Sequence, residues 1–142
     1  MSDIENMDIR WQQRFQNFEK TFLLLQKALA LERPDWLQRA GLVQMFEITF
    51  DLSWKLLKDY LEYQGFEALL SPRSTLKKAF EISLIEDGRA WLELLEKRNL
   101  TTHTCDEVEI TNVTAQIRST YFVLFQNLYS IFSKINTEYN AK

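Results

Sequence analysis

Apolar residues recur every three or four positions through almost the whole chain, and this spacing is what most constrains its fold. The 142 residues include only three glycines and two prolines, so few positions interrupt a helix. An all-β domain would need many more turn residues. The sequence therefore predicts one all-α domain that occupies residues 1–142.

The first two expected helices are long, and each has one apolar face. The first runs from about residue 8 to about residue 32. The second follows the Arg33-Pro34 break, with Pro34 in its first turn, and it ends near residue 64, where Gly65 is placed as a C-terminal cap. Their apolar faces consist of Trp11, Phe15, Phe18, Phe22, Leu25 and Leu29 in the first helix, and Leu42, Phe46, Phe50, Ser53, Leu57 and Leu61 in the second.

Three further helices are expected in the second half of the chain. Ser71 as N-cap and Pro72 at the first position predict a short helix over about 72–84, and a fourth helix follows Asp87-Gly88. Thr104 and Glu107 match a capping box, which predicts a fifth helix from about 105 to about 139. Short connections between four long helices predict an antiparallel four-helix up-and-down bundle with one additional short helix. The apolar face of the fifth helix would consist of Val108, Val113, Ile117, Tyr121, Leu124, Leu128, Phe132 and Ile135.

Composition excludes several classes of function. The net charge of −3 argues against a general nucleic-acid coat protein, which would be basic. A single cysteine cannot form an intrachain disulfide, and MSDIENMDIR does not read as a leader, so we expect a cytoplasmic protein without a membrane partner. One histidine and one cysteine give no zinc cluster, and no glycine-rich phosphate loop is present in the sequence, so we expect no metal and no cofactor.

The stretch RNLTTHTC, residues 98–105, holds the only histidine, His103, five positions after Arg98. A turn between two helices could bring the two side chains together beside a helix N-terminus, which favours an anion. A neutral imidazole can take the proton of a ribose 2′-OH while a guanidinium holds the phosphate, so the pair is suited to RNA cleavage without metal. The alternative is a polar turn in which Arg98 offsets the helix dipole and His103 is solvated.

Two further sets of charged residues are candidate contacts. The face of the second helix opposite its apolar residues carries Glu47, Asp51 and Lys55 at four-residue spacing. This face is either solvated, with an Asp51–Lys55 ion pair, or a surface that contacts a partner. In SPRSTLKKAF, residues 71–80, Arg73 lies near a helix N-terminus. This segment is either a nucleotide or RNA contact or an ordinary surface helix.

Four segments taken in order resemble one family: WQQRFQNFEK (11–20), MFEITFDLSWKLLKDYLEYQGF (45–66), SPRSTLKKAF (71–80) and DGRAWLELLEKRNLTTHTCDE (87–107). They are similar to the nucleotidyltransferase substrate-binding protein family within the HEPN superfamily, whose relatives include HepT-like toxins. The resemblance implies a bundle of about five helices that forms a homodimer. It also implies association with a separate, minimal-type nucleotidyltransferase, for which this subunit completes the substrate site.

The toxin relatives are metal-independent ribonucleases that the nucleotidyltransferase silences. Their Arg-x4-to-6-His motif falls on Arg98 and His103, with Asn99 as the polar residue beside the arginine. Those relatives commonly continue His-x-Tyr, and the partner adenylylates the tyrosine, whereas this chain has Cys105 at that position.

Two hypotheses follow from the resemblance. In the first, the chain binds nucleotide or RNA for its partner and carries a ribonuclease site made of Arg98, His103 and Asn99. In the second, it is a non-catalytic subunit that docks the nucleotidyltransferase, with Glu47, Asp51, Lys55 and Arg73 as the contacts.

Overall fold

The computed structural model describes residues 3–101 and 106–141, and within these ranges all regular secondary structure is helical. This confirms the all-α prediction. The elements are α1 (Asp3–Leu29), α2 (Trp36–Tyr63), α3 (Pro72–Glu81), α4 (Gly88–Thr101), α5 (Glu107–Gln116), the π-helical turn η1 (Ile117–Tyr121) and α6 (Phe122–Asn140).

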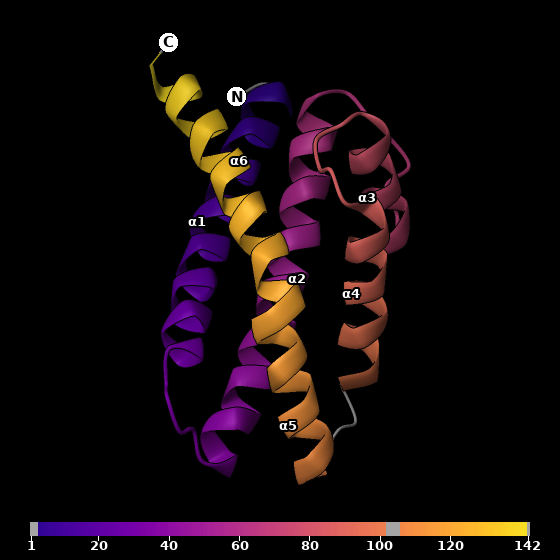
Figure 1. Ribbon diagram of the computed structural model, residues 1–142. Coiled ribbons are helices and arrows are strands. Elements are labelled where there is room, and N and C mark those ends of the chain that lie inside the picture. Colours follow the sequence, from indigo (N-terminus) through magenta and orange to yellow (C-terminus); the bar gives the residue numbers. More distant parts are fainter. Residues whose placement is uncertain (1–2, 102–105, 142) are drawn as a thin grey trace.

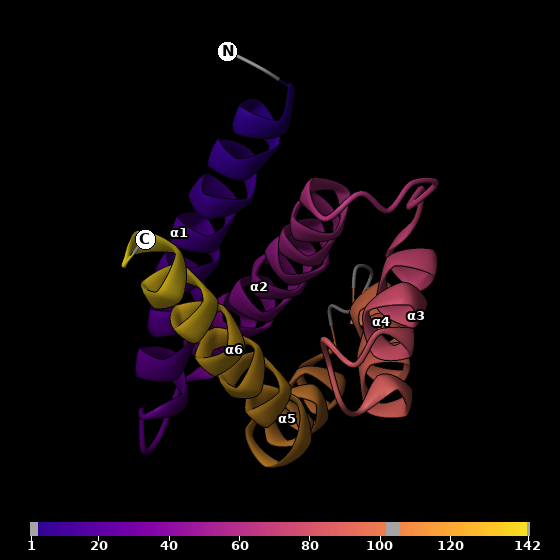
Figure 2. The ribbon, with the colours of Figure 1, turned by 90° about the horizontal axis from the view of Figure 1, so that it is seen from above.

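Helix α2 is the central element of the fold. It packs against α1, α3, α4, α5 and α6. The chain reverses direction between α1 and α2, which lie side by side, and both chain ends lie at the same end of the molecule (Figure 1). Seen from above, α1 lies on one side of α2 and the α3–α4 pair on the other (Figure 2). This arrangement leaves α3 and α4 at an edge of the molecule.

The apolar faces expected for the first two helices form the core. All of the α1 and α2 face residues are buried except Leu29, which is partly buried. Aromatic rings join α1 to α6, because Phe22 stacks on Phe122 and Tyr129 with centroid separations of 5.3 and 4.9 Å. The aromatic residues on these helical faces therefore pack the core, as their spacing predicts.

The ends of α1 and α2 differ in part from expectation. Helix α1 begins at Asp3, ahead of residue 8, and ends at Leu29. Placing Pro34 in the first turn of the second helix was wrong, because the helix begins at Trp36 with Asp35 as its N-cap. Asp35 and Gln38 form a reciprocal capping box, in which the Gln38 N–H donates to the Asp35 carboxylate at 2.7 Å.

Gly65 ends α2 as predicted. It has a φ of +99°, and its N–H donates to the carbonyl of Glu62 while the N–H of Phe66 donates to that of Leu61. This pattern is a Schellman motif, and the left-handed backbone it requires suits glycine.

Helix α3 begins as predicted and ends earlier. Ser71 is the N-cap, and its hydroxyl accepts from the Ser74 N–H at 3.1 Å. The helix ends at Glu81 rather than near residue 84, and Ser83 has a left-handed φ of +64° that a continuing helix cannot contain.

The last helical segment contains two corrections. Asp106, not Thr104, is the N-cap of α5, since its carboxylate accepts from the N–H groups of Val108 and Glu109; Thr104 and Cys105 lie outside the described residues. Val108 does not belong to the buried face, being 68% exposed. On a regular helix it stands about 140° from Val113, five residues on, whereas the buried Ile110 is only three residues from Val113.

The helix that continues to Asn140 is not a regular α-helix throughout. In η1 the Phe122 N–H donates to the carbonyl of Ile117, five residues back. Such a π-turn inserts one residue into the helix, and the chain changes direction here between α5 and α6 (Figure 2).

Candidate functional site

Arg98 is held by two carboxylates of the neighbouring helix. It lies in the last turn of α4, which packs against α2, and Glu47 and Asp51 lie one turn apart on α2. Its Nη1 donates to Glu47 Oε2 at 3.0 Å, and its Nε and Nη2 donate to the two Asp51 carboxylate oxygens at 3.2 and 3.0 Å. The contact with Asp51 is therefore bidentate, the geometry in which guanidinium and carboxylate bind most specifically.

Thr101 completes this group, which we call the Arg98 cluster: Arg98, Glu47, Asp51 and Thr101. The Thr101 side chain is buried, and its hydroxyl lies 2.9 Å from the Arg98 carbonyl and 3.2 Å from Glu47 Oε2. Its single hydrogen can be donated to either acceptor. Thr101 therefore links the end of α4 to the Glu47 carboxylate.

The cluster is partly shielded from solvent. The side chains of Arg98, Glu47 and Asp51 retain 21%, 20% and 40% of their exposure. The Asp51 hydrogen bond, together with the negative charge of both carboxylates, raises the pKa of Arg98 above its usual value against the opposing effect of burial. Arg98 therefore stays charged, and a phosphate that binds it must compete with two carboxylates.

The structure brings together three of the residues singled out in the sequence: Arg98, Glu47 and Asp51. The expected Asp51–Lys55 pair does not form, because Asp51 is paired with Arg98 and Lys55 is exposed. Asn99 is exposed one residue after Arg98. His103 lies outside the described residues.

Arg73 lies in the first turn of α3 and is exposed. Across residues 3–101 and 106–141, no hydrogen bond or ion pair joins Arg73, Lys55 or Asn99 to the Arg98 cluster.

Sequence reasoning did not place Thr101 in this cluster. The available signal was its position three residues after Arg98, which puts both residues on the same side of a helix.

A hollow of about 550 Å³ lies beside the cluster, between the end of α4 and α5. Thr101 belongs both to its wall and to the Arg98 cluster. The hollow is large enough for a small ligand. Its lining offers one cation, one carboxylate and two amides beside apolar groups: Lys97, Leu100, Thr101, Glu109, Asn112, Val113 and Gln116.

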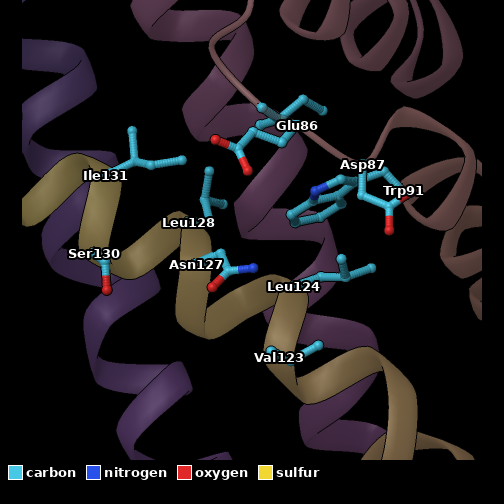
Figure 3. A pocket seen from close by; sticks show the side chains of 10 residues that line it. Glu86, Asp87, Trp91, Val123, Leu124, Asn127, Leu128, Ser130 and Ile131 are labelled. Carbon is cyan, nitrogen blue, oxygen red and sulfur yellow. The ribbon is translucent and has the colours of Figure 1, made fainter.

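A second hollow, of about 450 Å³, lies between α6 and the start of α4 (Figure 3). Trp91, Leu124 and Leu128 contribute its apolar wall. Its charged lining residues are Glu86 and Asp87, so it disfavours a phosphate-bearing ligand.

Among residues 3–101 and 106–141, no three His, Cys, Asp or Glu side chains are grouped so as to hold a metal ion. In the same ranges, no helix combines the length and apolar character needed to cross a membrane.

The chain is similar in sequence and in fold to known proteins. The profile of the family described as "Nucleotidyltransferase substrate binding protein like" matches residues 13–134. A curated protein of Haemophilus influenzae named "Probable ribonuclease HepT" is 32% identical over 82 residues, which are 55% of this chain. The chain spans just over half, 56%, of that relative's length.

A crystal structure of a protein from Thermus thermophilus has the same fold. It is 31% identical in sequence and superposes with a TM-score of 0.71, covering 80% of this chain and 96% of the other.

Proposed function

Since the chain belongs to the nucleotidyltransferase substrate-binding protein family, we propose that it is the substrate-binding subunit of a two-component system. Its partner is a separate, minimal-type nucleotidyltransferase that carries out nucleotidyl transfer. The observation that carries this proposal is the family match, which extends over residues 13–134. In this proposal the chain is a cytoplasmic homodimer, and its helices form a HEPN-type antiparallel four-helix bundle with α3 as the additional short helix.

We further propose that the subunit carries a metal-independent ribonuclease site. His103 removes the proton from a ribose 2′-OH, the 2′-oxygen attacks the adjacent phosphorus to form a 2′,3′-cyclic phosphate, and the 5′-oxygen leaves and takes up a proton from water as a 5′-hydroxyl. Arg98 binds the phosphate and stabilises the charge that develops on it, and Asn99 supports the site. Two observations support this proposal: the similarity to a ribonuclease, and a hollow of about 550 Å³ that is lined by Thr101 of the Arg98 cluster.

The carboxylates of Glu47 and Asp51 compete with an RNA phosphate for the Arg98 guanidinium. The side chains of Arg98, Glu47 and Asp51 together carry a formal charge of −1, from one guanidinium and two carboxylates. This net negative charge repels RNA, so RNA binds only when Arg98 is released from at least one carboxylate. The proposal therefore predicts that Glu47→Gln with Asp51→Asn strengthens RNA binding, whereas Arg98→Lys weakens it because a lysine cannot bind bidentately.

The pairing of Arg98 also favours a second candidate function, a non-catalytic subunit that docks the nucleotidyltransferase. An arginine held at 3.0 Å by each of two carboxylates is well suited to fastening α4 to α2. In this role the exposed Lys55 and Arg73, together with the outer edges of Glu47 and Asp51, would contact the partner. Cys105 in place of the usual tyrosine fits this role, since silencing by adenylylation would then be unnecessary.

RNA cleavage by the purified chain in EDTA tests the ribonuclease proposal. We expect wild-type protein to cleave and His103→Ala to lose cleavage while keeping its circular-dichroism spectrum and its oligomeric state. If neither protein cleaves and both are folded, the non-catalytic function stands instead. Co-expression with the nucleotidyltransferase, followed by gel filtration, tests the two-component proposal itself, because separate elution would contradict it.

A further inference from the structure

An apolar hollow between α3 and α4 has exposed cations at its edge. The hollow has a volume of about 220 Å³ and is lined by Leu76, Lys77, Phe80, Gly88, Arg89 and Leu92. We call it the α3–α4 hollow. Phe80 leaves 51% of its surface exposed, which is unusual for a side chain beside the core. The two helices lie at the edge of the molecule opposite α1 (Figure 2). The hollow shares no lining residue with the Arg98 cluster.

Gly88 allows the Phe80 ring to form one wall of this hollow. A Cβ atom added at Gly88 would lie 2.7 Å from Phe80 Cγ and 2.9 Å from Phe80 Cδ2, closer than van der Waals contact permits. Any other residue at position 88 would therefore push the ring away from the start of α4. The hollow therefore depends on the close approach of the Phe80 side chain to the backbone of Gly88.

The two cations at the edge of the hollow form no ion pair with the residues that the structure describes. Lys77 and Arg89 are exposed, and neither forms an ion pair with a residue of 3–101 or 106–141. Their neighbour Lys78 differs, because it pairs with Glu81 at 3.2 Å and lies over the Phe66 ring. Lys77 and Arg89 are the charged residues of the lining, so the edge of the hollow carries two positive charges.

We propose that the α3–α4 hollow docks an acidic, amphipathic segment of the nucleotidyltransferase. One leucine or phenylalanine side chain of that segment enters the hollow between Leu76, Phe80 and Leu92, and flanking carboxylates pair with Lys77 and Arg89. This inference rests on the proposed two-component function and adds the surface and the chemistry of the partner contact.

The size of the hollow fits such an anchor. An apolar cavity of ~150 Å³ accepts benzene, so 220 Å³ accommodates one large apolar side chain. A central apolar anchor with charged groups at its rim is the usual composition of a protein–protein interface.

RNA fits the same surface less well. Two cations give only weak and salt-sensitive phosphate binding. The apolar walls at Leu76, Phe80 and Leu92 present no hydrogen-bonding side chains for base edges, which leaves stacking on Phe80 and the donors of Lys77 and Arg89. The apolar side chain of a protein partner buries the whole hollow, which favours the protein.

The test is the dissociation constant of the purified nucleotidyltransferase for this chain and three variants. Lys77→Glu with Arg89→Glu reverses both rim charges, and Phe80→Ala removes the apolar wall. The matched control, Lys20→Glu with Lys134→Glu, reverses two exposed cations on α1 and α6. We expect binding at least tenfold weaker for the first variant, about 30-fold weaker for Phe80→Ala and unchanged within twofold for the control.

The possible outcomes separate this inference from the proposed function. If wild type binds and all variants bind equally well, the docking surface is wrong while the two-component function stands. If wild type does not bind the nucleotidyltransferase at all, both are overturned. If Lys77→Glu with Arg89→Glu loses affinity for a fluorescent single-stranded RNA and keeps its affinity for the nucleotidyltransferase, the surface binds RNA and the inference is refuted. Thermal melts of the exposed-site variants verify that each is folded.

Discussion

Replacing Arg98 by methionine should lower the free energy of unfolding by about 2 kcal/mol. Methionine keeps much of the apolar stem and removes the guanidinium, so the change reports on the ionic contacts of the Arg98 cluster. A fully exposed ion pair contributes about 0.2–1 kcal/mol, and breaking a buried one costs about 3–5 kcal/mol. Side-chain exposures of 20–40% place each of the two pairs near the upper end of the exposed range.

Repulsion between the two carboxylates adds to this loss. Glu47 and Asp51 are four residues apart on α2, and without Arg98 they form a like-charge pair that costs about 0.3 kcal/mol. Two pairs at about 0.8 kcal/mol each and this repulsion sum to about 2 kcal/mol. For a chain of this length we expect the melting temperature to fall by about 6–8 °C.

Urea unfolding followed by far-UV circular dichroism measures the effect. A double-mutant cycle of Arg98→Met with Asp51→Asn isolates the bidentate pair, and its coupling energy should be about 1 kcal/mol. The control cycle combines Arg98→Met with Lys134→Gln, a change of an exposed residue on α6, and should show no coupling. A coupling below about 0.3 kcal/mol for the Asp51 cycle would refute the view that this pair fastens α4 to α2.

Three further predictions concern other parts of the molecule. Arg14→Met should lower the free energy of unfolding by about 3 kcal/mol, because it leaves Asp59, which is 5% exposed, without its partner at 2.9 Å; Arg14→Met with Asp59→Leu should recover most of this loss in urea titrations. Asp106→Ala removes the N-cap of α5 and should cost about 1 kcal/mol by the same assay, whereas Glu107→Ala should cost less. Burial raises the pKa of the Tyr60 and Tyr121 hydroxyls above 10.0, so the folded state keeps protons that the unfolded state loses. Stability should therefore be unaffected by these groups below pH 10 and fall as pH rises above it, and phenolate absorbance during thermal melts in alkaline buffers checks this sign.

The sequence predicts features whose cause is local. Ser71-Pro72 and Gly65 are recognisable because a cap depends on the residues next to it. Where two possible N-cap residues are close together, the local sequence does not decide which of them begins the helix. Thr104 and Asp106 are two positions apart, and it is the Asp106 carboxylate that caps α5.

The contacts of Arg98 are not local. Its partners are 47 and 51 residues away along the chain, and only the packing of α4 against α2 brings the groups together. The sequence contains a partial signal, since Glu47 and Asp51 share one face of α2. That signal also fits a pair with Lys55, and nothing within α2 distinguishes the two partners.

The π-turn η1 makes the chain length adjustable by one residue in this part of the protein. The turn holds one residue more than an α-helical turn, so deleting one residue between 117 and 121 would join α5 and α6 into one regular helix with their faces in nearly the same register. Asn112 and Gln116 would then keep the helix face that lines the hollow beside Thr101, and the change of direction between α5 and α6 would be lost. An alignment of relatives should therefore show one-residue deletions at this turn more often than within α5 or α6.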